Sequence, residues 1–223
     1  MSRKYWSKLA VAIIFIIPAL FYLVLSFGNH RYTRLPYYAA QKTASNDLKN
    51  AYSLTDFSLI QSGVTQLNAN VVDEKIVLWN AIHTNDYILS PAIIANLQFI
   101  QDRFQDRKDI RIISLVTNKS NKTQVTNYAN TLNIDQHNWL VLHSDSTKIR
   151  RFLEDKLFVN YKELPDSLSH VVPSNEIILM DKNQHIRGYF DGGIHKEIKG
   201  KLVDAIDMLA REEFVVYREN EKE

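Results

Sequence analysis

Residues 76–91 read IVLWNAIHTNDYILSP, and this stretch decides the fold. The run IVLWNAI is almost continuously apolar, which is typical of a strand buried on both faces in the middle of a sheet. Ser90 suits the N-cap of a helix, and Pro91 suits the first turn, where no amide hydrogen is needed. The stretch therefore predicts a central strand that leads through a loop to the N-terminus of a helix.

The remainder of the chain alternates between strand-like and helix-like patterns. Apolar runs predict strands, and amphipathic stretches between them predict helices. The expected strands are 75–82, 110–116, 139–142, 177–180 and 186–190, and the expected helices are 90–107, 122–132, 146–153 and 196–213. This alternation, with an antiparallel hairpin and a helix at the end, predicts an α/β fold with a mixed central sheet flanked by helices.

The composition excludes several classes of function. The chain has 223 residues, 45% hydrophobic and 23% charged, enough for one ordinary domain and an anchor. A net charge of +2 without a long basic run argues against nucleic acid as a partner. Cysteine is absent, so disulfides, thiolate metal sites and a cysteine nucleophile are impossible. Since no known catalytic motif is present either, we expect that the protein is not an enzyme.

Residues 9–27, LAVAIIFIIPALFYLVLSF, predict a transmembrane anchor. The run has no charge and is long enough to cross a bilayer as a helix at about 1.5 Å per residue. Arg3, Lys4 and Lys8 precede it, and positive residues favour the cytoplasmic side. We therefore expect a single-pass inner (plasma) membrane protein with a cytoplasmic N-terminus and a periplasmic, or extracytoplasmic, C-terminal domain. A cleaved signal peptide is the alternative.

These patterns predict the domain organisation. Residues 1–8 form a cytoplasmic stub, 9–27 the anchor, 28–50 a tether, 51–213 the folded domain and 214–223 a charged tail. The tether is polar and has no sustained apolar period. The tail ends in RENEKE, a composition typical of a solvated end.

A set of segments in a fixed order suggests a family. They are Leu35-Pro-Tyr-Tyr, Phe57-Ser-Leu-Ile-Gln-Ser-Gly63, Lys75-Ile-Val-Leu-Trp79, Pro91 to Phe104, Asp109-Ile-Arg-Ile-Ile-Ser-Leu115 and Leu179 to Gly192. The last, LMDKNQHIRGYFDG, is the most specific. Together they resemble the Sco/SenC proteins, membrane-anchored thioredoxin-like factors linked to copper delivery to cytochrome c oxidase. The resemblance implies a thioredoxin-like fold behind an N-terminal transmembrane helix.

The functional residues of that family do not carry over to this chain. With Pro91 in the register of the proline of the family's C-x-x-x-C-P motif, the cysteine positions are Asp86 and Ser90. The register of the third copper ligand, a histidine, gives Pro173. Soft thiolates hold Cu(I), and a carboxylate, a hydroxyl and a proline do not replace them. We therefore expect no cofactor, and thiol–disulfide exchange is impossible.

Val172, Pro173 and Ser174 precede an apolar strand, which is also the pattern of the cis-proline segment of thioredoxins. In that segment the proline lies against the redox loop and exposes backbone to an extended partner chain. A degenerate site of this kind keeps a docking surface, together with Pro91, and loses the chemistry. An ordinary trans-proline at a strand start is an equal alternative.

Another set of residues allows a remodelled metal site. His83 and Asp86 follow the central strand, and His170 lies near the late strand. Histidine with a carboxylate suits Zn(II) or Cu(II), so copper or zinc binds only under this interpretation. Solvated loop residues are the alternative.

Two functions follow. The first is a non-catalytic interaction or assembly factor that binds a protein partner in the membrane or periplasm. A link to the biogenesis of respiratory cytochrome oxidase is implied by the resemblance alone. The second is a metal-binding or metal-delivery protein that uses His83, Asp86 and His170.

Overall fold

The computed structural model describes residues 13–14, 16–18, 20, 34–39, 42–54, 69–83, 90–118, 121–132, 134–135, 137–163 and 171–220. The chain divides into two compact units, Met1–Thr33 and Arg34–Glu223. Most of the expected anchor, residues 9–27, lies outside the described residues. Among the residues that are described, no helix has the length and apolar character needed to cross a membrane.

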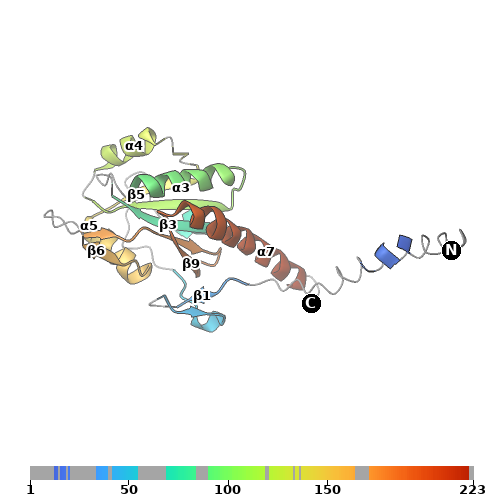
Figure 1. Ribbon diagram of the computed structural model, residues 1–223. Helices are drawn as coiled ribbons and strands as arrows, with labels where there is room; N and C mark the ends of the chain where they lie inside the picture. Colours follow the sequence, from blue (N-terminus) through green and yellow to red (C-terminus); the bar gives the residue numbers. More distant parts are fainter. Residues whose placement is uncertain are drawn as a thin grey trace, which may run out of the picture. The chain divides into compact units, whose positions relative to one another are not determined.

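A mixed sheet forms the centre of the second unit (Figure 1). Its strands lie in the order β5-β4-β3-β8-β9. They are β3 (Ile76–Ile82), β4 (Ile110–Val116), β5 (Trp139–His143), β8 (Glu176–Met180) and β9 (Ile186–Asp191). The first three run parallel, β8 runs antiparallel to β3, and β9 runs antiparallel to β8. The mixed sheet predicted from the sequence is confirmed, and β3 is buried along its whole length.

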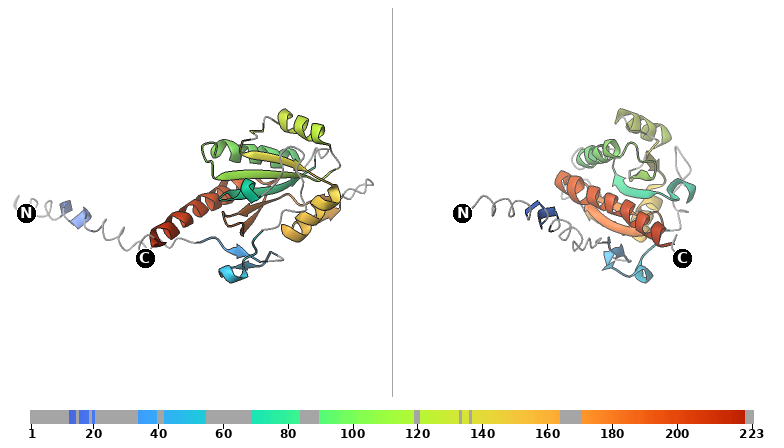
Figure 2. Two further views of the ribbon diagram at one scale, coloured as in Figure 1. Left: turned by 180° about the vertical axis from the view of Figure 1, so that it is seen from behind. Right: turned by 90° about the vertical axis from the view of Figure 1, so that its right-hand side faces the viewer.

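Helices cover both faces of this sheet (Figures 1 and 2). One face carries α3 (Ser90–Arg103), α4 (Lys122–Thr131) and a C-terminal helix made of α6 (His195–Glu197), a π-helical stretch η4 (Ile198–Leu202) and α7 (Val203–Asn220). The other carries α2 (Ala69–Val72), α5 (Ser146–Arg151) and a π-helical stretch η3 (Phe152–Lys156). A separate antiparallel pair, β6 (Tyr161–Glu163) and β7 (Val171–Pro173), precedes β8.

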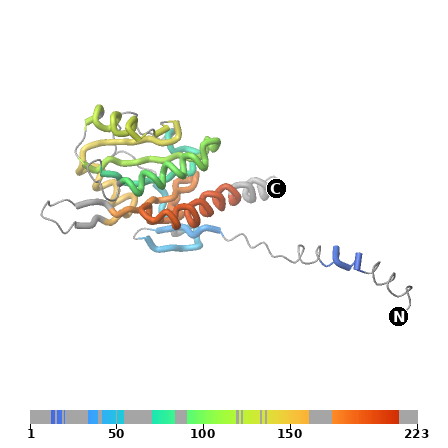
Figure 3. The backbone as a smooth tube through the Cα atoms, turned by 45° about the horizontal axis from the view of Figure 1, so that its top comes forward, coloured from blue at the N-terminus to red at the C-terminus, as the bar shows by residue number. Residues whose placement is uncertain are grey.

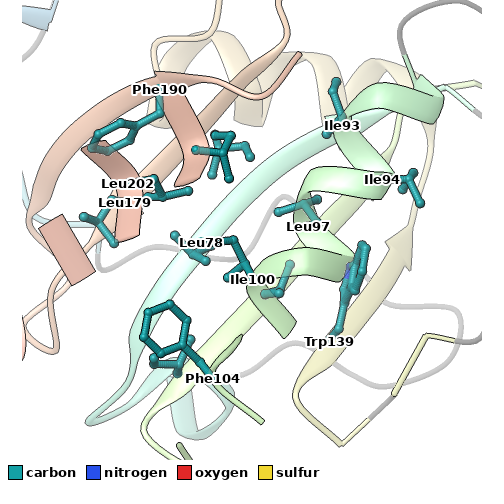
Figure 4. Packing of buried hydrophobic residues seen from close by; sticks show 14 of the residues in the cluster. Leu78, Ile93, Ile94, Leu97, Ile100, Phe104, Trp139, Leu179, Phe190 and Leu202 are labelled. Atoms are coloured by element: carbon teal, nitrogen blue, oxygen red, sulfur yellow. The ribbon is translucent and has the colours of Figure 1, made fainter. Parts of the chain in front are cut away.

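The alternation of side chains along β3 divides the core between the two faces. Ile76, Leu78 and Ile82 pack under α3 and the C-terminal helix, whereas Val77 and Trp79 pack against η3. Figure 4 shows Leu97 and Ile100 of α3 directed at Leu78. Each such apolar side chain contributes about 1.5–3 kcal/mol when it is fully removed from water. The central strand is therefore the element on which both layers depend.

The ends of two helices differ most from their expected positions. Helix α3 ends at Arg103 and not at residue 107, because Phe104 to Asp106 form a turn that leads to β4. The C-terminal helix continues to Asn220, so the expected tail 214–223 begins as helix. Residues such as Glu and Arg favour helix when a helix already precedes them, and charge alone did not distinguish this from a solvated end.

The expected tether 28–50 was also wrong where the structure describes it. From Arg34 onward the chain belongs to the second compact unit. Strand β1 (Tyr37–Tyr38) pairs with β2 (Ala44–Ser45), and a 3-10 turn η2 (Leu48–Asn50) follows. Figure 3 shows this light-blue segment beside the red C-terminal helix. The cause is a set of long-range hydrogen bonds to backbone groups, which the local sequence pattern does not reveal.

Candidate functional site

The parallel strands end at one edge of the sheet, and two of the motif positions, Ser90 and Pro173, belong to elements that begin or end near that edge. Helix α3 starts after the loop that follows β3. Strand β8 begins at the same edge, because it is antiparallel to β3 and Ile177 lies opposite Asn80. Topology therefore places Ser90 and Pro91 on one side and Pro173 and Ser174 on the other. Ligand sites in open α/β sheets typically lie outside the carboxyl ends of the parallel strands.

Of the candidate residues before and at the start of α3, the structure describes His83, Ser90 and Pro91. Ser90 is the first residue of α3, and Pro91 is exposed in its first turn. His83 directly follows β3 and is half-buried. Asp86 and His170 lie outside the described residues, so their approach to His83 stays a prediction. In the described ranges, no group of three or more histidine and acidic residues is arranged to hold a metal ion.

Pro173 is the last residue of β7 and lies opposite Tyr161. The cis-proline interpretation was wrong, because no cis peptide bond occurs in the part of the chain that the structure describes, which includes the backbone of Val172 and Pro173. The alternative is correct in the trans peptide bond and differs in position, because Pro173 ends a short strand and does not start one.

Ser174 is buried, and this changes its expected part in a docking surface. Its amide donates to the carbonyl oxygen of Asn160 at 2.8 Å. Its hydroxyl donates to Oε2 of Glu176 at 2.7 Å. Because the side chain is buried and both the amide and the hydroxyl are hydrogen-bonded within the protein, Ser174 does not contact a partner directly. Ser174 instead fixes the backbone where β7 joins β8.

An ion pair that the sequence analysis missed lies at this junction. Nζ of Lys42 is 2.5 Å from Oε1 and 2.6 Å from Oε2 of Glu176, although the two residues are 134 positions apart. The same ammonium lies 4.7 Å from the ring centroid of Tyr189. Burial, and next the negative charge of Glu176, raise the pKa of Tyr189, so its phenol stays protonated. No local motif predicts such a pair, because it depends on how a distant segment folds back.

A chain of buried, hydrogen-bonded polar side chains crosses the interior of the sheet. Nε1 of Trp139 donates to Oγ of Ser114 at 2.8 Å, and Ser114 Oγ donates to Oδ1 of Asn80 at 2.6 Å. All three side chains are buried. The chain connects β5, β4 and β3 across the sheet and restricts how these strands shift relative to one another. The signal in the sequence was a polar residue inside each of two apolar runs, at Asn80 and Ser114.

The residues at the motif positions do not fit copper held in the manner of the Sco/SenC motif. The chain contains no cysteine, so it offers no thiolate. A proline stands in the register of the histidine ligand and has no side-chain donor. No chemical step through copper is therefore derived for this edge.

This chain is similar to known proteins in structure, and comparisons of its sequence found no match. No family model matches the chain, and no curated protein sequence matches it. A SCO1/SenC family lipoprotein from Bacillus anthracis matches with a TM-score of 0.59 and 13% identity, over 79% of this chain and 97% of that one. BsSco, described as a member of the Sco family of cytochrome c oxidase assembly proteins, matches with a TM-score of 0.58 and 15% identity, over 79% and 98%.

A copper-bound structure is also similar. Arabidopsis thaliana ScoI with copper bound matches with a TM-score of 0.54 and 13% identity, over 66% of this chain and 91% of that one. At such identities the likeness shows the fold alone. The chain therefore has a Sco-like fold of the α/β thioredoxin-like class, in a sequence without any cysteine.

Proposed function

We propose that this chain is a membrane-anchored, extracytoplasmic, non-catalytic assembly factor that binds a protein partner at the sheet edge between α3 and the β7–β8 junction. The anchor is the segment 9–27. The proposed process is the biogenesis of a respiratory cytochrome oxidase. Its support is the fold shared with BsSco, which is described as belonging to cytochrome c oxidase assembly proteins.

One observation carries the proposal: a Sco-like fold occurs with Asp86, Ser90 and Pro173 at the motif positions of a cysteine-free chain. Without a thiol, the chain cannot exchange disulfides or hold Cu(I) between thiolates. A protein that keeps the fold and lacks these groups can still act by binding another protein through its surface.

The proposed surface has an exposed part and a rigid support. Pro91 and Ala92 are exposed in the first turn of α3. Across the edge, the β7–β8 junction is fixed by the hydrogen bonds of Ser174 and by the pair of Lys42 with Glu176. Binding surfaces held by a rigid scaffold lose little conformational freedom when a partner binds. This combination suits recognition of a folded or extended protein segment.

Site-specific photo-crosslinking in the native membrane tests the proposal. A photoreactive amino acid replaces Ala92 at the start of α3, and a matched variant carries it at Asp102 near the end of the same helix. Both positions are exposed, and they lie at opposite edges of the sheet. We expect a discrete crosslinked protein species from position 92 and none from position 102. Equal crosslinking from both positions, or none from either, would contradict a docking surface at this edge.

A further inference from the structure

Residues 35–45, here called the strap, contain the antiparallel pair β1–β2, which lies beside β9. Residues 40 and 41 of the strap lie outside the described part. Its first residues contact Arg187 at the start of β9, its middle contacts Tyr189, and Lys42 reaches Glu176 at the start of β8. The strap therefore connects the point where the chain enters the domain with the edge proposed for docking.

The first end of the strap is bound through its backbone. Arg187 donates from Nη2 to the carbonyl oxygen of Leu35 at 2.7 Å and from Nε to that of Pro36 at 3.2 Å. The amide of Leu35 donates to Oε1 of Glu212 at 2.8 Å. The guanidinium also lies 4.1 Å from the ring centroid of Tyr37. Charge-assisted hydrogen bonds of this kind are roughly twice as strong as neutral ones, so this end is held firmly.

The middle of the strap packs on the same strand. The rings of Tyr38 and Tyr189 meet edge to face with centroids 5.2 Å apart. The carbonyl oxygen of Tyr38 accepts from the amide of Tyr52 at 3.0 Å. These contacts keep the strap along β9 between its two charged ends.

The far end of the strap reaches the docking edge. Lys42 lies in the turn between β1 and β2 with a φ of 60°, a conformation that lysine rarely adopts. That turn directs its ammonium to Glu176, whose Oε2 also accepts from the hydroxyl of Ser174. Glu176 thus accepts hydrogen bonds both from the strap and from the β7–β8 junction.

We infer that the strap is a positioning device for the docking edge, and that Lys42 is its positioning residue. The inference concerns how the proposed docking edge is regulated, and in that respect it rests on the proposed function. With Lys42 in place, the Glu176 carboxylate has a cationic partner and a fixed orientation, and it holds Ser174 and the adjacent backbone in one conformation. Displacement of the strap at Arg187 would release the same junction from the opposite end of β9.

Hydrogen exchange of the full-length protein tests this inference. The informative amides are those of Ser174, bonded to Asn160, and of Gly192, bonded to the carbonyl oxygen of Asn175 at 2.6 Å. Amides of β4 serve as the internal reference for global opening. In Lys42→Met we expect both informative amides to exchange about tenfold faster than in the wild type, with β4 unchanged, because loss of a charge-assisted bond lowers the cost of local opening.

Two further lysine variants provide the controls. Lys49 is exposed on the neighbouring η2 turn, so Lys49→Met is expected to leave these amides unchanged. Lys42→Arg keeps the charge and is expected to restore most of the protection. If Lys42→Met leaves the two amides unchanged, or if Lys49→Met accelerates them equally, the inference is overturned.

A variant at the other end tests transmission along the strap. Arg187→Lys keeps a charge and loses the planar group that binds two carbonyl oxygens at once. We expect faster exchange of the Ser174 amide relative to β4, and its absence would overturn the coupling. The crosslink at position 92 is recorded separately. If the variant that carries the photoreactive amino acid at position 92 and no other change gives no such crosslink, the proposed function fails, and the exchange data still decide whether the strap positions the edge.

Discussion

Nη2 of Arg187 donates to Oε2 of Glu212 at 2.8 Å, and this bond joins β9 to the C-terminal helix within a buried charged cluster. The Arg187 side chain is only 3% exposed. Nη1 of Arg187 also donates to Oδ2 of Asp181 at 3.1 Å, in the turn between β8 and β9. One guanidinium thus connects a hairpin, a helix and the backbone of Leu35.

Replacing this guanidinium is expected to destabilise the fold strongly. In Arg187→Met the carboxylates of Asp181 and Glu212 lose their positive partner while they remain largely buried. Breaking a buried pair in this way costs about 3–5 kcal/mol. Arg150→Met is the control, because its pair with Glu154 is exposed and worth at most about 1 kcal/mol. Urea unfolding measures both, and similar losses in the two variants would show that the cluster is not a main support.

Two glycines are expected to respond in opposite directions to alanine. A Cβ at Gly192 would lie 2.8 Å from the carbonyl oxygen of Asn175, which is backbone and cannot move aside easily. Gly192→Ala is therefore expected to cost about 1–3 kcal/mol. A Cβ at Gly200 would meet nothing within 4 Å, so Gly200→Ala is expected to stabilise the C-terminal helix by about 0.5–1 kcal/mol. Thermal unfolding of both variants checks the opposite signs, and a shift in the same direction would be incompatible with these environments.

The hydrogen-bonded side chains Trp139, Ser114 and Asn80 are expected to depend on the middle residue, Ser114. Ser114→Ala removes the acceptor of Trp139 Nε1 and the donor to Asn80 Oδ1. Leaving buried polar groups unpaired costs about 1–3 kcal/mol. Because the two residues act together, the combined variant Ser114→Ala with Trp139→Phe is expected to lose less than the sum of the single losses. A double-mutant cycle measured by denaturant unfolding tests this. If the two losses of unfolding free energy simply add, Ser114 and Trp139 are not energetically coupled.

Asp109 is expected to make stability depend on pH in the acid range. Nε and Nη2 of Arg107 donate to its two carboxylate oxygens at 2.7 and 2.6 Å. These bonds lower the pKa of Asp109 below its ordinary value of 3.8. A lowered pKa in the folded state stabilises the fold above the ordinary value, and this contribution disappears as the pH falls through the lowered pKa.

Asp109→Asn tests this pH dependence. Since the pair is partly exposed, we expect a loss of about 0.2–1 kcal/mol at neutral pH. The difference from the wild type should shrink in the acid range, where the wild-type carboxylate is protonated. A difference that stays constant from neutral to acid pH would contradict an ionic contribution from Asp109.

The sequence predicted the parts of the fold that depend on local pattern. The apolar run of β3, the helix that starts at Ser90 and the β8–β9 hairpin each carry their own periodicity and turn signals. It failed at Arg34 to Asn50, because the contacts that order this segment come from Arg187, Glu212 and Glu176, far along the chain. A polar segment has no apolar period to reveal such docking.

The sequence predicted the elements around the candidate site better than their contacts. The strand-to-helix connection after β3 is present, and the binding site expected at the carboxyl ends of the parallel strands stays a prediction. The burial of Ser174 and the ion pair between Lys42 and Glu176 depend on tertiary packing and left no spacing motif. Asn80 and Ser114 were visible as polar residues in apolar runs, but their hydrogen bond follows only from the register of β3 against β4.

Anaerobic titration of the full-length protein with Cu(I), together with titrations of Cu(II) and Zn(II), decides between an assembly factor without a metal and a metal-binding protein. We expect only weak binding, at the level of surface histidines, and no change in binding when Asp86→Ala and Ser90→Ala are combined. Function in oxidase assembly should also be unchanged in that double variant. Tight stoichiometric binding that is lost on changing His83, Asp86 or His170 would overturn the proposed function. It would show a remodelled metal site and a surviving role in metal delivery.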